Sequence, residues 1–83
     1  MSENNQKLVM LLSRVLDIDQ TLISDNTSPE NTDSWDSYNA LLLVSELESE
    51  FDIHFTMEEV YAVKCVKDIK EALIRHNVGS FDY

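Results

Sequence analysis

The sequence has one cysteine, one glycine and one proline among its 83 residues. The single cysteine, Cys65, excludes an intrachain disulfide and leaves too few thiolates for a cysteine-based zinc site. The scarcity of glycine and proline argues against a β-sandwich, which needs frequent turns, and favours helices joined by polar loops. A chain of this length fits one small domain, which buries only about 60% of its unfolded surface and therefore has a thin core.

Basic residues are also scarce. Six Lys and Arg stand against 16 Asp and Glu, which gives a formal net charge of −10. No Lys or Arg occurs between Arg14 and Lys64, while most of the acidic residues lie there. A nucleic-acid-binding surface needs the opposite sign, so this class is disfavoured. An acidic surface instead suits basic protein partners.

Long apolar runs are absent too. No segment reaches the roughly 20 apolar residues that a membrane-spanning helix needs, and residues 1–5 lack the charged and apolar regions of a signal peptide. His54 and His76 are isolated, and the acidic residues do not follow the spacing of a calcium-binding loop. These absences predict a cytoplasmic protein without membrane insertion and without a specific metal site.

What the sequence does contain is the periodicity of amphipathic helices. The expected helices span residues 3–16, 36 or 37–51, 57–63 and 66–76. Thr56 and Glu59 match a capping box at the start of the short third helix. Together these elements predict an all-α fold, a small four-helix bundle in a single domain (1–83), with a core at about 3–76 and a short C-terminal tail at 77–83. We expect a monomer.

The helical periodicity disappears between residues 17 and 35, which predicts a long ordered loop between the first two helices. Ile18, Leu22 and Ile23 are expected to pin this loop to the bundle. Trp35, at its end, is interpreted as a core anchor. Cys65 is expected to be a buried or half-buried structural thiol.

The second helix has two predicted faces. Ala40, Val44, Leu47 and Phe51, with Leu43 beside them, form the expected core face. Tyr38 and Leu42 fall on the outer side, next to outward-pointing Glu46 and Glu50. Exposed hydrophobic residues beside glutamates indicate either a contact surface for a partner or a cover for a neighbouring loop.

The segment Trp35-Asp36-Ser37-Tyr38 places a serine hydroxyl in the first turn of the second helix. A phosphate ester there would face unpaired backbone N–H groups and the positive end of the helix dipole. Asp and Ser are also common helix caps, so the pair alone is weak evidence. A hydrolase triad of Ser37, His54 and an aspartate is a further possibility, but the glycines of a nucleophile elbow are missing. No catalytic residue is predicted.

The sequence downstream of Ser37 makes the signal specific, because Asp36-Ser37-Tyr38 is followed by an acidic and hydrophobic pattern in a characteristic register. The matching pairs and residues are Leu43-Val44, Leu47-Glu48, Glu50-Phe51, Asp52, Glu58-Glu59 and Val66. In this register, from about Leu8 to Leu73, the chain resembles the acyl carrier proteins. The resemblance implies a carrier and not an enzyme, with 4'-phosphopantetheine attached covalently to Ser37.

The resemblance also implies partners. A phosphopantetheinyl transferase would modify Ser37, with Asp36 helping to dock it, close to its magnesium ion. Acyl-activating, synthase or acyltransferase enzymes would bring basic patches to the second helix. The residues implied in partner binding are Tyr38, Leu41, Leu42, Glu46, Glu48 and Glu50. Inward residues of the second and third helices would line a cavity that shelters the acyl chain.

Several positions depart from the family pattern. Tyr38 replaces the usual leucine or methionine, Ser34 stands where a glycine is common, and Leu42 takes a position that is commonly acidic in the fatty acid carrier. Cys65 replaces a Ser or Thr cap, so a weaker cap is expected on the last helix. The cargo stays open: fatty acid or specialised-metabolite intermediates, or aminoacyl, peptidyl or polyketide groups. An unmodified acidic interaction module is the alternative outside the carrier class.

Overall fold

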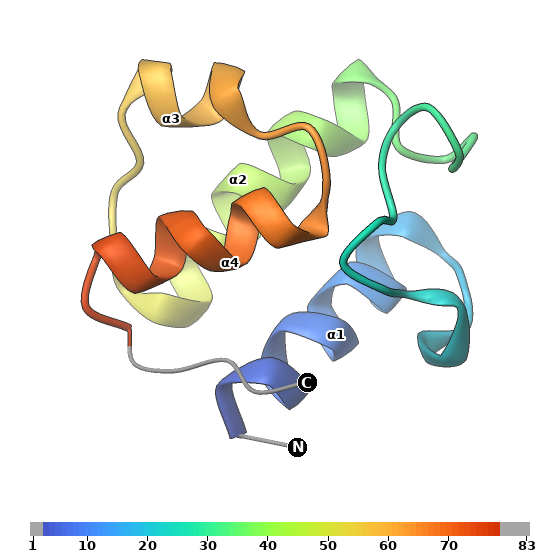
Figure 1. The fold of residues 1–83 in the computed structure, drawn as a ribbon, viewed down its shortest axis with the longest axis horizontal. Helices are drawn as coiled ribbons and strands as arrows, with labels where there is room; N and C mark the ends of the chain where they lie inside the picture. Colours follow the sequence, from blue (N-terminus) through green and yellow to red (C-terminus); the bar gives the residue numbers. More distant parts are fainter. Residues whose placement is uncertain (1–2, 79–83) are drawn as a thin grey trace.

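A computed structural model of the chain describes residues 3–78, and in this range it contains helices and no strands (Figure 1). The elements are α1 (Glu3–Leu16), a short 3-10 helix η1 (Gln20–Leu22), α2 (Ser37–Phe51), α3 (Met57–Ala62) and α4 (Val66–Arg75). The predicted all-α fold with a long first loop and a short third helix is confirmed. The predicted helix boundaries agree with these to within one residue.

The core lies between α1, α2 and α4, and α3 lies on the side of the molecule opposite α1 (Figure 1). Helix α1 contributes most of the fully buried side chains. The buried cluster consists of Leu8, Leu11, Leu12, Leu16, Trp35, Leu43, Leu47, Val66, Ile69 and Leu73. Trp35 is only 5% exposed, which confirms its predicted role as a core anchor.

On α2, Leu47 is buried and Ala40 and Phe51 pack against the core, as predicted, while Leu43, predicted beside them, is buried as deeply as Leu47. Val44 is partly buried. One packing prediction is wrong. Leu22, predicted to pin the loop, is 69% exposed, because η1 turns its side chain away from the bundle. Ile18 and Ile23 do pack against the core.

The long loop is docked on the start of α4. The backbone N–H groups of Val66 and Lys67 donate to the carbonyl oxygens of Thr27 and Asp25, at 2.9 and 3.1 Å. The Cys65 side chain, as expected, makes no capping hydrogen bond and is half-buried. Loop carbonyl groups therefore accept from N–H groups at the start of α4, which a Ser or Thr side chain would otherwise cap.

An ion pair strengthens this docking. The Nζ atom of Lys70, on α4, lies 2.8 Å from Oδ1 of Asp25 in the loop. Lys70 is buried, which is rare for a lysine and requires compensation of its charge. The loop thus has a fixed path towards Ser37.

The only glycine is at position 79, so no glycine is available where α1, α2 and α4 end. Asp17, Asp52 and Asn77, just after α1, α2 and α4, adopt left-handed backbone conformations with φ of 54°, 53° and 63°. Asp and Asn are the non-glycine residues that tolerate this region best. Beyond α4, Val78 packs against the core, so ordered packing extends past the predicted core limit at residue 76. The rest of the predicted tail, 79–83, lies outside the described residues.

Candidate functional site

Ser37 is the first residue of α2, and its side chain is exposed. The carboxylate of Asp36 accepts a hydrogen bond from the backbone N–H of Asn39 at 2.9 Å, which fixes the start of the helix. Within residues 3–78 the Ser37 hydroxyl has no hydrogen-bond partner. Ser37 therefore presents a free hydroxyl group beside first-turn N–H groups that favour an anion.

The segment before Ser37 is held rigidly. The side-chain amide of Asn39 donates to the carbonyl oxygen of Ser34 at 2.7 Å. The backbone N–H of Trp35 donates to the carbonyl oxygen of Thr32 at 2.9 Å. The buried Trp35 side chain anchors the same segment in the core. An enzyme acting on Ser37 would therefore meet a preformed surface.

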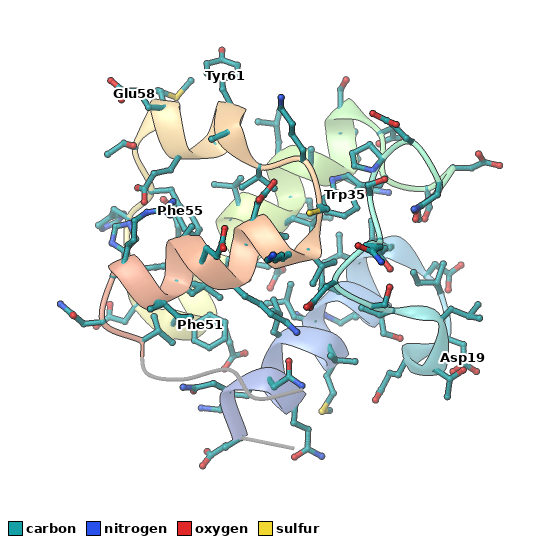
Figure 2. The ribbon with its side chains drawn as sticks, viewed as in Figure 1. Asp19, Trp35, Phe51, Phe55, Glu58 and Tyr61 are labelled. Carbon is teal, nitrogen blue, oxygen red and sulfur yellow. The ribbon has the colours of Figure 1, made fainter. Side chains whose placement is uncertain are left out.

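The exposed face of α2 next to Ser37 is apolar. Tyr38 is 74% and Leu41 is 69% exposed, and they lie three residues apart on one side of the helix. Leu42, predicted on the outer side, is half-buried, so Leu41 is the leucine that accompanies Tyr38 at the surface. On α3, Met57 and Tyr61 are exposed as well, and Figure 2 shows Tyr61 pointing away from the molecule.

The three glutamates predicted to meet partners differ in their surroundings. Glu46 pairs with Arg14 of α1, with 3.1 Å between Oε2 and Nη2. Glu48 accepts a hydrogen bond from the backbone N–H of Phe55 at 2.9 Å and lies 3.9 Å from His54. Glu50 is exposed and has no ion pair within the described part of the chain. Of these three glutamates, Glu50 alone presents a carboxylate that no group within residues 3–78 engages.

A partly enclosed cavity of about 120 Å³ lies between α2, α3 and α4. Its walls are almost entirely apolar, and the loop contributes to them. The lining residues are Pro29, Trp35, Ala40, Leu43, Val44, Leu47, Phe55, Glu59, Val60, Val63 and Ile69. Trp35 and Phe55 are labelled in Figure 2. Ala40, in the cavity wall, lies about one helical turn from Ser37.

Glu59 is the one charged residue among the described residues that line the cavity. Its Oε1 atom accepts a hydrogen bond from the backbone N–H of Thr56, which confirms the predicted capping box, and lies 2.9 Å from Nε2 of His76. The Nε atom of Arg75 lies 3.8 Å from Oε2. The hydrogen bond from Thr56, and then that with His76, hold the pKa of Glu59 below its usual value, so this carboxylate stays ionised.

Within residues 3–78, the candidate residues considered above do not come together as a catalytic or metal site. His54 faces Glu48 and makes no hydrogen bond with Ser37. Among residues 3–78, no group of three His, Cys, Asp or Glu side chains converges on a point that could hold a metal ion. In the same range no helix is both long and apolar enough to cross a membrane.

Comparison with known families supplies the deciding observation. The family model described as "Phosphopantetheine attachment site" matches residues 6–73, which include all of α2 and α3 and most of α1 and α4. The chain belongs to this family. Its members carry covalently attached 4'-phosphopantetheine, so the protein is a carrier and not an enzyme. Carriers of this family are modified by a phosphopantetheinyl transferase and interact with synthase enzymes.

The fold of the carrier agrees with this assignment. The solved structure of Rv0033 from Mycobacterium tuberculosis, provisionally described as an acyl carrier protein, matches with a TM-score of 0.78 and 25% sequence identity. The match covers 87% of this chain and 96% of the other. No curated protein matches the sequence significantly.

Sequence reasoning missed part of the carrier's cavity. It expected inward residues of α2 and α3, but Pro29, Trp35 and Ile69 come from the loop and from α4. Glu59 was interpreted only as a helix cap, although it also faces the cavity. Its neighbour Val60 gave no signal for this, because successive residues of an α-helix point about 100° apart.

Proposed function

We propose that this chain is an acyl carrier protein that carries acyl intermediates as thioesters on a 4'-phosphopantetheine arm attached to Ser37. The pathway would belong to fatty acid or specialised-metabolite biosynthesis, with aminoacyl, peptidyl or polyketide cargo as the alternative. The observation that carries the proposal is the hydroxyl of Ser37, which is exposed at the first position of α2, has no hydrogen-bond partner within residues 3–78 and lies inside the family match.

The chemistry requires little of the carrier itself. Ser37 Oγ would form a bond to the phosphorus of the pantetheine phosphate of coenzyme A, while the bond from that phosphorus to adenosine 3',5'-bisphosphate breaks and the hydroxyl proton leaves to the transferase or solvent. The free N–H groups of the first turn of α2 would favour the resulting phosphodiester anion. When bound, the arm supplies a thiol that holds cargo as a thioester.

Asp36 would serve this reaction in two ways. Its carboxylate caps α2 through Asn39, which keeps Ser37 at the surface. It also lies next to the hydroxyl in sequence, where a carboxylate would attract the magnesium ion and the basic residues of a transferase. The tight capping geometry supports the first role directly.

The docking surface would centre on the exposed apolar face of α2. We propose Tyr38 and Leu41 as its main contacts, with Glu50 as a separate charged contact about two and a half turns further along α2. Leu42, Glu46 and Glu48, also implied by the family resemblance, would contribute less, since Leu42 is half-buried and the two carboxylates are engaged within the chain. The partners would be a phosphopantetheinyl transferase and acyl-activating, synthase or acyltransferase enzymes with basic docking patches.

The test is the intact mass of the protein after incubation with coenzyme A, magnesium and a broad-specificity transferase. We expect one phosphopantetheine on the wild type and none on Ser37→Ala. Ser45→Ala is the matched control, because Ser45 is another exposed serine of α2, and it should be modified like the wild type. An unmodified wild type would contradict the proposal and favour an acidic helical interaction module. A modified Ser37→Ala variant would move the attachment to another residue.

A further inference from the structure

We infer that the cavity between α2, α3 and α4 encloses short acyl chains, of about five carbon atoms, and leaves the ends of longer chains in solvent. The inference rests on the proposed function, because it concerns the cargo on the Ser37 arm. It names the class of cargo that the carrier shelters.

The size of the cavity sets the limit. A protein cavity of about 150 Å³ lined by apolar side chains binds benzene, which has six carbon atoms. The cavity here measures about 120 Å³. The same ratio of volume to atoms gives space for roughly five carbons. Shelter from water would stabilise each buried methylene, and a longer chain would gain nothing from its remaining carbons.

On the side that faces the core, the walls leave little room for the cavity to expand. Leu43, Leu47 and Ile69 are at most 3% exposed, and they belong to the same packed cluster as the leucines of α1. Moving them to admit a longer chain would disturb close packing throughout a small core. Trp35 adds a large ring from the loop, whose path is fixed by its contacts with α4.

The wall near α3 is also held in place. The ring of Phe55 packs edge-on against His76, with 5.5 Å between ring centroids, and its backbone N–H donates to Glu48. Glu59 joins the start of α3 to His76 and Arg75 at the end of α4. Because the Glu59 carboxylate is ionised, an alkyl chain extended across it would desolvate a charge, which is unfavourable.

The experiment loads the protein with acyl arms of increasing length. The transferase would receive acetyl-, butanoyl-, hexanoyl-, octanoyl- or dodecanoyl-coenzyme A, intact mass would verify each product, and the melting temperature would be compared with that of the unacylated holo-protein. We expect the largest rise in Tm, about 4 °C or more, with butanoyl or hexanoyl arms. Octanoyl and dodecanoyl arms should give no further rise.

Two variants locate the effect in the cavity. Val60→Ala removes two methyl groups from the wall while favouring the helix, and it should shift the greatest rise in Tm to chains about two carbons longer. Val15→Ala is the matched control, since Val15 packs on the core from α1 and does not line the cavity. It should lower the Tm of every form without changing the preferred chain length.

The outcomes separate the two proposals. A rise in Tm that continues to the dodecanoyl arm, or no rise with any arm on a correctly loaded protein, would overturn the inference and leave the carrier function standing. An unchanged preferred length in Val60→Ala would also overturn it. Failure of Ser37 to accept any arm would instead show up in the mass spectrum, and it would overturn the proposed function and the inference together.

Discussion

Individual residues that look alike in the sequence offer a partner different surfaces. Glu46 and Glu50 both follow Ser37 on α2, but Glu46 already joins α2 to α1 through Arg14, while Glu50 is exposed. A basic residue of a partner would have to compete with Arg14 for Glu46. For the same reason, replacing Glu46 with lysine would set two cations side by side, and any loss of modification would mix folding with docking.

Leu41 provides a cleaner test of the docking surface. We expect Leu41→Ala to slow transfer of phosphopantetheine to Ser37 by about tenfold, because truncating a central apolar contact typically costs more than about 1 kcal/mol of binding. Glu50→Gln should slow it less than about threefold, as expected for a charge at the rim. The measurement is the initial rate of transfer at a protein concentration well below saturation, with a thermal melt of each variant.

Leu22→Ala is the matched control for this test. Leu22 and Leu41 are both 69% exposed leucines, but Leu22 lies on η1 and not beside Ser37. Its truncation should leave the rate unchanged, and neither leucine variant should alter stability by more than about 0.5 kcal/mol. Equal slowing by both would mean that the apolar face of α2 has no special part in recognition.

At the scale of the element, α3 depends mainly on polar contacts for its position over the cavity. It has six residues, none of them buried, and its partly buried Val60 faces the cavity. Its ties to α4 are polar and centre on Glu59, through His76 and Arg75. The state of this one carboxylate should therefore affect how firmly α3 closes over the cavity.

We expect Glu59→Gln to make stability less dependent on pH under acidic conditions. The pKa of Glu59 is lowered in the folded protein, chiefly by the hydrogen bond from Thr56 and then by His76. A lowered folded pKa gives stability that is present above the unfolded pKa of about 4.3 and is lost as pH falls through the folded value. Wild-type stability should thus fall more steeply than that of Glu59→Gln below about pH 5, as measured by urea unfolding at each pH.

The neighbouring Glu58 supplies the control for that experiment. Glu58 is on the same helix and is exposed, and Figure 2 shows it pointing away from the molecule. Glu58→Gln should reproduce the wild-type slope. A Glu59→Gln variant with the full wild-type slope would mean that other carboxylates carry the acid dependence.

The elements themselves follow from local signals in the sequence. The Thr56–Glu59 capping box and the leucine spacing of α1 involve residues within one or two turns, so α1 and the start of α3 were predicted correctly. The carbonyl groups of Asp25 and Thr27 that cap α4 come from about 40 residues earlier in the chain, and no local pattern encodes such a contact. The exposure of Leu22 likewise depends on how η1 turns, which apolar spacing does not specify.

The candidate site likewise has features that the sequence predicts and features that depend on tertiary packing. The position of Ser37 at the start of α2 could be predicted, because Asp36 is a strong helix cap next to a periodic helix. Which leucine accompanies Tyr38 at the surface could not, since Leu41 and Leu42 differ by only one position around a helix. The pairing of Glu46 with Arg14 also depends on tertiary packing, here between α1 and α2.

At the scale of the whole molecule, net charge competes with specific ion pairs. The chain carries a formal charge of −10 within dimensions of 30 × 29 × 19 Å. Four pairs of a Lys or Arg with an Asp or Glu oppose the repulsion in the described part of the chain. They are Lys7–Glu3, Arg14–Glu46, Lys70–Asp25 and Arg75–Glu59. Exposed pairs contribute little individually, so repulsion should dominate.

We therefore expect sodium chloride to raise the Tm, and mostly at low concentration. The screening length is about 30 Å at 0.01 M salt and about 10 Å at 0.1 M, so repulsion across the whole 30 Å molecule is removed within this interval. A rise of several degrees is expected, since about 1 kcal/mol corresponds to 4–8 °C in a domain of this size. Choline chloride should give the same curve, because ionic strength is the cause. A Tm that falls with salt would mean that the attraction within the four ion pairs outweighs the repulsion due to the net charge. The acidic surface would then be neutralised mainly by basic residues of the same chain, and less of its charge would be available to basic partners.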